Sequence, residues 1–562
     1  MPVRSPVPDV VIPSEDVTTF FFKHAQARSS QYSALGEEPP LAISASSGDS
    51  LNFTAIKQMA GAVARSLLAR GITFDANAPC DGLSNVVAVY SPADIRFTAI
   101  HFGVLMAGGI YTAIDPNMDT ADVLRRLEET NAMIVFVAPA LLPQLLDLIA
   151  SSGLDIPASN VILTHGDQTS SPSIDSLDNT PFEPPSCLDV DLASRVAMIM
   201  YTSGTSGRPR GVMLTHRNIV AMYTLVGGYS ARSQVIDKHP SVGSGIEQGR
   251  MLSALPLWHI YGHCVLCYQP LYTGDCAVLM PAFEIAGYLN AIEKYRITRL
   301  NTTPSILHTL FTKTVRCENS KVAIKTDLSK QYDVGSVKAL GCGGAQLPPN
   351  RLQQCYDYFN HAPVVVGYGL TESCSVLAGG SWLRPAPGAI GIIYPNSIAK
   401  VVDQEGIETD DYGELCVSGP HVMKGYVGSQ ATGPISADGF LHTGDCARIA
   451  ADGNVFLKGR MSDVIHTSHG LIYASDVENK LMQHPAVEDT AVVAYETGEG
   501  GAHLVAFVVL ASAVDSAEQL GGVEGWIGQH VSGAEISCRE TAAIPKSQAG
   551  KVLRHLLRAK LD

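Results

Sequence analysis

The stretch from Met198 to Gly211 has the residue types that most clearly suggest chemistry, and it reads MIMYTSGTSGRPRG. An apolar run ends there in glycines, hydroxyl residues and two arginines. Glycine lets backbone N–H groups converge on an anion, hydroxyls add hydrogen-bond donors, and arginines add positive charge. A buried strand precedes the group, and Thr215 is placed to cap a helix that follows. The stretch therefore predicts a phosphate-binding loop, and a flexible polar turn is the alternative.

The loop does not match the two common nucleotide motifs, G-x-x-x-x-G-K-[ST] and the dinucleotide fingerprint. Instead, YTSGTSGRPRG closely resembles YTSGTTGxPKG, the phosphate loop of the adenylate-forming (AMP-binding) superfamily. That superfamily includes acyl-CoA synthetases of the 4-coumarate-CoA ligase type, beetle luciferases and peptide-synthetase adenylation domains. Its other motifs follow in order across about residues 50–560: LPLWHIYG from Leu255, CGGAQL from Cys342, GYGLTES from Gly367, GELCVSGPHVMKGY from Gly413, DGFLHTGD from Asp438 and PKSQAGKVLR from Pro545.

The resemblance implies ATP and Mg²⁺ as cofactors and assigns a role to each matching residue. Thr371 and Glu372 would lie at the α-phosphate, with Glu372 as the magnesium ligand because a hard cation prefers carboxylate oxygen. Lys551 would bridge the substrate carboxylate and the α-phosphate and offset transition-state charge. The implied nucleotide-binding set is Thr202, Ser203, Gly204, Thr205, Ser206, Gly207 and Arg210 at the β- and γ-phosphates, Gly344, Ala345, Gly367, Tyr368 and Gly369 around adenine, Asp445 at the ribose, and Arg460 at the ribose or a phosphate.

The same resemblance places an acyl pocket near Trp258, His259, Tyr261, Thr303, Gly343 and Val366. These residues are largely apolar or aromatic, and no basic side chain for a second carboxylate is evident among them. A hydrophobic monocarboxylate, fatty or aryl, is therefore the expected substrate. We expect His259 to act as a pocket gate or to contact the acyl-adenylate, with a structural core histidine as the alternative.

Three positions depart from the family pattern. Arg210 replaces the loop lysine, which keeps the charge but changes its geometry. Ser462 stands at the hinge position usually held by Asp or Lys. His469 occupies the position of a glycine that approaches the pantetheine arm, with Gly470 next to it. These two residues mark the expected thiol tunnel. A side chain at His469 would narrow that tunnel for coenzyme A, unless Gly470 takes over the glycine's place with a one-residue adjustment.

The leading hypothesis is an AMP-forming acid-thiol ligase that makes an acyl-adenylate and transfers the acyl group to coenzyme A. The first alternative loads a carrier-protein phosphopantetheine of a polyketide or peptide synthetase. Alternatives of another class are a luciferase-like oxidoreductase and a nucleotide-binding pseudoenzyme. The presence of Glu372, Asp445 and Lys551 argues against the pseudoenzyme.

Alternating strand and helix patterns must position these residues. Short β-branched runs at 86–91, 132–138 and 195–201 predict buried strands, and 53–70 predicts a helix. Such alternation is typical of an α/β fold with parallel sheets covered by helices. We expect a large AMP-binding domain over residues 1–459 and a small mobile α+β domain over 460–562, hinged around Arg460 to Ser462. Strands at 491–496 and 503–510 and a helix at 552–560 should form the small domain.

Composition narrows the partners to small molecules. The 562 residues carry a net charge of −15, which repels nucleic acid and anionic membrane surfaces. The uncharged run 98–114 is better explained by a buried helix and strand than by a membrane span. The N-terminus lacks a secretory pattern, and the twelve cysteines are scattered, so a cytoplasmic protein with reduced thiols is expected. A peroxisomal location is the alternative, because the AKL tripeptide before Asp562 resembles a peroxisomal signal, although such signals are terminal. The zinc-like spacing of His259, His263, Cys264 and Cys267 is attributed to an apolar helix.

Overall fold

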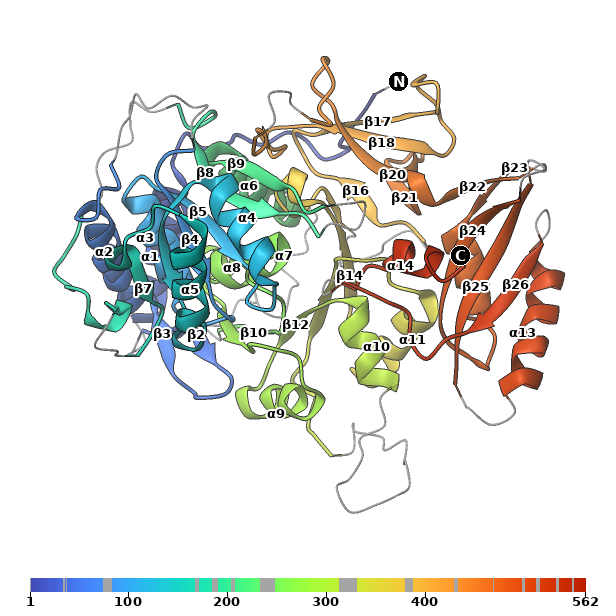
Figure 1. The fold of residues 1–562 in the computed structure, drawn as a ribbon, viewed down its shortest axis with the longest axis horizontal. Coiled ribbons are helices and arrows are strands. Elements are labelled where there is room, and N and C mark those ends of the chain that lie inside the picture. The colour runs from blue at the N-terminus through green and yellow to red at the C-terminus, as the bar shows by residue number, and fades with distance from the viewer. Residues whose placement is uncertain are drawn as a thin grey trace.

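Two large β-sheets form the body of the protein (Figure 1). The structure is a computed structural model that describes residues 2–33, 36, 38–73, 83–166, 171–183, 191–203, 208–232, 248–312, 331–379, 388–428, 433–467, 470–497, 501–511, 516–531, 535–547 and 550–561. Statements about elements and contacts refer to these residues.

The first sheet contains seven strands in the part of the chain that the structure describes. Its order is β19 (Gly425–Tyr426), β9 (Gly211–Thr215), β8 (Val196–Tyr201), β5 (Ile110–Ile114), β4 (Val86–Tyr90), β6 (Ala132–Val137) and β7 (Val161–Leu163). The strands from β8 to β7 run parallel, and β4, β5 and β8 are buried along their whole length. Burial on both faces explains their continuous apolar runs and confirms the predicted strands.

The second sheet contains fourteen strands among the described residues. Its parallel part is β2 (Pro40–Ser44), β11 (Cys276–Leu279), β10 (Arg250–Ser253), β12 (Arg299–Thr302), β13 (Ala339–Cys342) and β14 (Val364–Tyr368). Antiparallel strands flank this part: β3 (Ser50–Asn52), β15 (Ala378–Gly379), β16 (Gly391–Ile393), β21 (Asn454–Arg460), β20 (Leu441–Ile449), β18 (Gly413–Ser418), β17 (Ile398–Val402) and β1 (Val3–Arg4).

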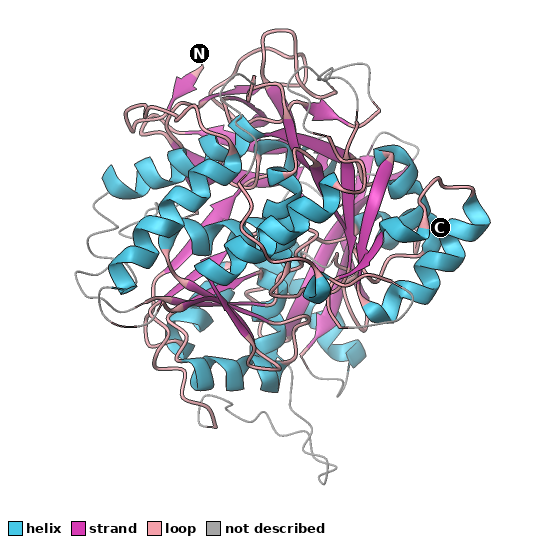
Figure 2. Ribbon diagram, turned by 90° about the vertical axis from the view of Figure 1, so that its left-hand side faces the viewer, coloured by secondary structure: helices cyan, strands magenta, loops and turns pink. Residues whose placement is uncertain are grey.

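Helices form a layer between the two sheets and cover their outer faces (Figures 1 and 2). The inner layer is α1 (Val17–Ser33), α2 (Phe53–Leu68), α3 (Phe97–Met106), α6 (His216–Arg232) and the helical segment Ile260–Thr273, made of α7 (Ile260–His263), a π-helical turn (Cys264–Tyr268) and α8 (Gln269–Thr273). Outside the first sheet lie α4 (Thr120–Thr130) and α5 (Leu142–Ser152), and outside the second lie α9 (Ile285–Tyr295), α10 (Pro304–Thr312) and α11 (Pro349–Tyr358). The α/β prediction is confirmed.

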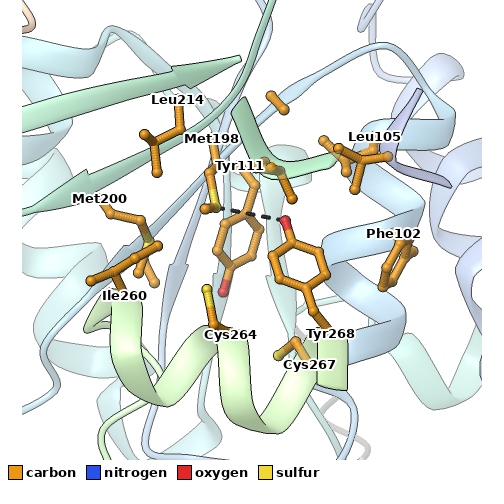
Figure 3. Packing of buried hydrophobic residues seen from close by; sticks show 14 of the residues in the cluster. Phe102, Leu105, Tyr111, Met198, Met200, Leu214, Ile260, Cys264, Cys267 and Tyr268 are labelled. Atoms are coloured by element: carbon orange, nitrogen blue, oxygen red, sulfur yellow. Dashed lines mark hydrogen bonds between the residues drawn. The ribbon is translucent and has the colours of Figure 1, made fainter. Parts of the chain in front are cut away.

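The segment Ile260–Thr273 has one face in the core. Cys264 and Tyr268 point toward Tyr111 and Met198 of the first sheet, as Figure 3 shows, and Cys267 is buried in the same cluster. The nine cysteines within the described ranges are all free and buried, as expected for reduced thiols.

The C-terminal segment follows the turn Met461–Asp463 and lies beside the body (Figure 1). It contains a pair of strands, β22 (Val464–Thr467) and β23 (Gly470–Tyr473), and a sheet of β24 (Val487–Thr497), β25 (Gly501–Leu510) and β26 (Ile536–Glu540). Its helices are α12 (Ala474–Leu481), α13 (Ser516–His530) and α14 (Arg554–Arg558). The predicted tail helix is shorter than 552–560 because Val552 bridges to Lys546 and Leu553 donates to the Pro545 carbonyl at 2.9 Å.

Two local features of the sequence prediction hold. Thr215 Oγ1 accepts from the Asn218 N–H at 3.1 Å, and Asn218 Oδ1 accepts from the Thr215 N–H at 2.9 Å, a reciprocal cap at the start of α6. The run 98–114 forms most of α3 followed by β5, as predicted. No helix in the described ranges is long and apolar enough to cross a membrane.

Candidate functional site

A cavity of about 650 Å³ lies where the ends of both sheets meet the C-terminal segment. Its wall includes residues from the predicted phosphate loop, from the strands β12 to β14 and β20, and from the terminal loop that carries Lys551. A volume of this size is typical of a small-molecule site. The cavity thus brings together residues that are up to about 350 positions apart in the chain, from Thr202 to Lys551.

The two ends of the phosphate loop are fixed by the first sheet. Tyr201 closes β8, donates its hydroxyl to Glu129 at 3.0 Å, and lies under the Arg126 guanidinium, 4.2 Å from the ring centre. Across the hairpin, the Thr202 N–H donates to the Arg210 carbonyl at 3.0 Å, and the Arg210 N–H donates to Thr202 Oγ1 at 3.1 Å. Thr202, Ser203, Arg208 and Arg210 line the cavity, whereas Gly204, Thr205, Ser206 and Gly207 lie outside the described residues.

Glu372 is held at the cavity wall by a neighbour of the phosphate loop. It lies in the turn Thr371–Ser373 directly after β14, and its Oε1 accepts from the Tyr426 hydroxyl at 2.7 Å. The Arg210 guanidinium lies 5.2 Å from the centre of the Tyr426 ring. Burial and the nearby Glu372 carboxylate raise the pKa of Tyr426, so the hydroxyl stays a donor. A carboxylate lining this cavity is a suitable oxygen ligand for Mg²⁺.

Asp445 lies just behind the wall, in a network with two cavity-lining residues. Tyr368 donates its hydroxyl to Asp445 Oδ2 at 2.7 Å, and Arg460 Nε lies 3.2 Å from Oδ1. Arg460 also donates to the Thr443 carbonyl at 3.0 Å. In the pairing of β20 with β21, Arg460 lies directly opposite Asp445. Burial raises the pKa of Asp445, and the Arg460 charge and the Tyr368 hydrogen bond oppose that rise. The pairing explains how a nearly buried carboxylate is tolerated.

Lys551 enters the cavity from the C-terminal segment. Burial and the Arg460 charge lower the pKa of Lys551, while Asp445 and Glu372 act in the opposite direction. The loop is closed on itself, because the Ser547 N–H donates to the Lys551 carbonyl at 2.8 Å. It is also tied to β24, because Lys546 pairs with Asp489 at 2.6 Å.

Gly550 allows that loop to approach the body closely. Its φ is +85°, and a Cβ added there would lie 3.0 Å from the Ser305 Cβ at the start of α10. A side chain at this position would have to push the loop away from α10, which explains the glycine before the lysine in AGKVLR.

His259 lines the cavity between the two halves of the site. Its Nδ1 accepts from the Tyr261 N–H at 3.2 Å at the start of α7. Burial and the Lys551 charge lower the pKa of His259 to about 4, so the ring is neutral at physiological pH. It is therefore a polar wall residue, and its zinc-like neighbours His263, Cys264 and Cys267 lie in the core instead.

The part of the cavity formed by β12 and the segment Ile260–Thr273, which we call the far end, is more polar than the acyl pocket that the sequence predicts. Tyr261 and Gly343 line it as expected, but so do the polar side chains of Arg299, Asn301 and Gln269. Arg299 is a basic side chain that the sequence prediction did not place there. Three expected lining residues are absent from the wall in the described part of the chain: Trp258, Thr303, whose hydroxyl accepts from the Ile306 N–H at the start of α10, and Val366, whose neighbour Val365 faces the cavity.

Only some of the other predicted residues line the cavity. Gly344, Gly367, Gly369 and Thr371 line the cavity, Ala345 is not among its described lining residues, and Gly470 begins β23 in the C-terminal segment. His469 lies outside the described residues. Sequence reasoning missed Arg299 and Asn301, although their i, i+2 spacing in a strand puts them on one face.

Glu414, Cys416 and His442 are the one group of three ligand-type side chains in the described ranges whose donor atoms lie within 4.8 Å of one another. His442 Nδ1 lies 2.8 Å from Glu414 Oε2, and Glu414 Oε1 accepts from the Gly444 N–H at 2.9 Å. Burial raises the pKa of the Cys416 thiol to about 12. The group can hold a cation, but hydrogen bonds and a protonated thiol already satisfy it.

Comparison with known proteins agrees with this arrangement. The sequence model described as "AMP-binding enzyme" matches residues 22–427, and that of the "AMP-binding enzyme C-terminal domain" matches residues 476–551. A probable CoA ligase of Humulus lupulus is 27% identical over 96% of this chain and 92% of its own length. A 4-coumarate–CoA ligase-like protein of Oryza sativa subsp. japonica is 30% identical over 85% of this chain and 80% of its own.

Solved structures show the same fold. An anthranilate CoA ligase in complex with anthranoyl-AMP superposes with a TM-score of 0.78 at 18% identity, covering 96% of this chain and 97% of its own. The ATP-bound MatB of Rhodopseudomonas palustris gives a TM-score of 0.74 at 22% identity, covering 96% and 99%.

Proposed function

Because the chain belongs to the AMP-binding enzyme family of adenylate-forming enzymes, we propose that it is an AMP-forming acid-thiol ligase. It uses ATP to convert a fatty or aryl acid to an acyl-adenylate and then transfers the acyl group to coenzyme A. A cytoplasmic location and a small-molecule acid as partner belong to the same proposal.

The observation that carries the proposal is the entry of Lys551 into a cavity that Glu372 and Arg210 also line. In the first step a carboxylate oxygen attacks the α-phosphorus, the bond from that phosphorus to the bridging oxygen breaks, and pyrophosphate leaves. Both reactants are anions, so the barrier depends on charge neutralisation and alignment. A lysine near Asp445 and Glu372 is suited to hold the carboxylate against the α-phosphate.

The remaining residues bind different parts of the nucleotide. The loop 202–211 holds the β- and γ-phosphates, and Glu372 holds Mg²⁺, which when bound neutralises phosphate charge. Asp445 receives the ribose hydroxyls, with Arg460 and Tyr368 fixing its orientation. Gly344, Gly367 and Gly369 line the cavity and leave room for adenine, because backbone without side chains permits close approach.

Transfer to the thiol requires Lys551 to leave the cavity. We assign residues 460–562 to a small domain that rotates about Arg460 to Ser462, the point where β21 gives way to a short turn. The described contacts across this boundary include polar ones that water can replace, such as the Arg351 guanidinium on the Glu488 carbonyl at 3.2 Å, and this supports such a motion. The thiol would then pass near His469 and Gly470.

Pyrophosphate release with a panel of fatty, aryl and short acids, with and without coenzyme A, tests the proposal. Acid-dependent release followed by an acyl-CoA of the expected mass is the predicted result. Absence of release with every acid would contradict the reaction, and acyl-adenylate that accumulates regardless of coenzyme A would point to a carrier-protein acceptor.

A further inference from the structure

The far end of the cavity has a polar wall on one face of β12. Arg299 and Asn301 are two positions apart, so they share that face, and both line the cavity while being 7% and 6% exposed. Leu300 between them packs in the core on the opposite face of the sheet. A wall built for a hydrocarbon chain alone would gain nothing from an amide and a guanidinium, because burying them costs free energy unless they are paired.

The charge of Arg299 is balanced within the protein. Its guanidinium lies 3.5 Å from Asp275, which is 2% exposed at the start of β11. The pair accounts for the buried cation, and it leaves the wall polar without an excess charge. An incoming group therefore meets a neutral, strongly dipolar surface.

The side-chain amide of Asn301 has an unused hydrogen-bond donor. Its Nδ2 is buried and has no acceptor among the described residues. Buried amide donors without partners are rare in native proteins. Rotation about χ2 of an asparagine is soft, so the amide can turn its N–H toward the cavity that the residue lines.

Gly341 provides space beside that amide. A Cβ at Gly341 would lie 3.0 Å from Asn301 Oδ1 and 4.0 Å from the Tyr261 hydroxyl oxygen. That hydroxyl lies 3.4 Å from the Thr302 carbonyl oxygen and 3.5 Å from that of Gly341. Polar atoms of Asn301 and Tyr261 thus flank one small gap at the floor of the cavity.

The facing helix continues the polar wall. In the segment Ile260–Thr273, Cys264, Cys267 and Tyr268 face the core (Figure 3), whereas Tyr261, Val265 and Gln269 line the cavity. The π-helical turn Cys264–Tyr268 takes more residues per turn than an α-helix, which keeps positions four apart on one side. Gln269 is thereby placed on the cavity side of the segment, together with Tyr261.

We propose that the acid substrate carries an oxygen atom, as a hydroxyl, a carbonyl or a second carboxylate, at the end of its acyl group distant from the reacting carboxylate, and that Asn301 donates a hydrogen bond to it. The proposal rests on the adenylation function above and refines its substrate class. Asn301 acts as a specificity-determining residue, with Gln269 and Tyr261 as neighbours.

Matched acids test it. Acid-dependent pyrophosphate release is measured for octanoic, 8-hydroxyoctanoic and octanedioic acid, and for 3-phenylpropanoic and 3-(4-hydroxyphenyl)propanoic acid. The wild-type enzyme is expected to favour an oxygen-bearing member over its unsubstituted partner by about tenfold or more in kcat/KM. Asn301→Leu should remove that preference, because only the oxygen-bearing acid loses a hydrogen bond. Asn117→Leu, at an exposed position outside the cavity, is the control.

Several results would overturn the proposal. Preference for the unsubstituted acid in both series would do so, and so would an equal loss for both members of a pair in Asn301→Leu. If that variant does not fold, as judged by thermal unfolding, the wild-type preference decides alone. Release with unsubstituted acids only would overturn this proposal and leave adenylation standing, whereas no release with any acid would overturn both. The hydroxyl and dicarboxylate arms identify which oxygen group is recognised.

Discussion

The two ends of the cavity are built in different ways. At the end that we assign to the nucleotide, charged side chains from several elements neutralise one another, as Arg460 of β21 does for Asp445 of β20, and the C-terminal segment supplies Lys551. At the acyl end, one face of a parallel sheet and one helix form a continuous wall within the body. The first end is therefore suited to a step common to all acids, and the second to choosing among them.

The largest expected effect is the loss of Lys551. Lys551→Ala should lower acyl-adenylate formation by about 10²–10³-fold, because one charge that stabilises the transition state is removed. The loss should be the same for every acid, since the acyl end is untouched. Pyrophosphate release measures it, with Lys560→Ala, at an exposed position of the same segment, as the control.

The second half-reaction gives the matching check on Lys551. Thioester formation from supplied acyl-adenylate should be nearly unchanged in Lys551→Ala, because the lysine has left the cavity by then. Equal loss in both half-reactions would refute the role assigned to it.

Glu372→Gln should be the next largest effect. Replacing a carboxylate ligand is expected to raise the Mg²⁺ concentration needed for half-maximal pyrophosphate release by about 10- to 100-fold. Tyr426→Phe, which removes only the hydrogen bond to Glu372, should shift it in the same direction and less. An unchanged magnesium requirement in Glu372→Gln would place the cation elsewhere.

At the acyl end, Gln269→Leu should change selectivity by about tenfold or less without changing the KM for ATP. The side chain lines the same cavity as Asn301 and is not one of the residues that we assign to the nucleotide. Competition between two acids in one reaction measures the ratio directly. A change in KM for ATP with no change in that ratio would show that the two ends are not separate.

Low pH should destabilise the fold as a whole, and with it both ends of the cavity, whereas neutral pH should not. Burial lowers the pKa of His263 and of His421 to about 4, whereas an unfolded histidine titrates near about 6.5. Between these values the unfolded chain binds more protons, so stability present above about pH 6.5 is lost as pH falls toward 4. Each residue contributes on the order of 1–3 kcal/mol to this loss.

Urea unfolding at pH 7.5 and pH 5 measures the loss. His421→Leu should reduce the difference between the two pH values, and His555→Leu, at an exposed position, should leave it as in the wild type. An unfolding free energy that does not depend on pH would show that these histidines are not held neutral.

The same contrast explains what the sequence could predict. Glycines, hydroxyls and charges at the nucleotide end lie in contiguous motifs, so the motifs alone predict Glu372 and Lys551, and both line the cavity. The acyl wall is assembled from strands and a helix, where only the face of each residue matters. Val366 was predicted and Val365 lines the cavity because neighbouring strand residues point to opposite sides. Arg299 and Asn301 belong to no motif, and tertiary packing alone brings them to the wall.

Isotope transfer tests the central claim most directly. An accepted acid labelled with ¹⁸O in its carboxylate is incubated with ATP, Mg²⁺ and coenzyme A, and the AMP is analysed by mass spectrometry. If the carboxylate oxygen attacks the α-phosphorus, one labelled oxygen stays with AMP when the thiol takes the acyl group. One ¹⁸O in each AMP is the predicted result. Unlabelled AMP, or label found in inorganic phosphate, would contradict activation through an acyl-adenylate.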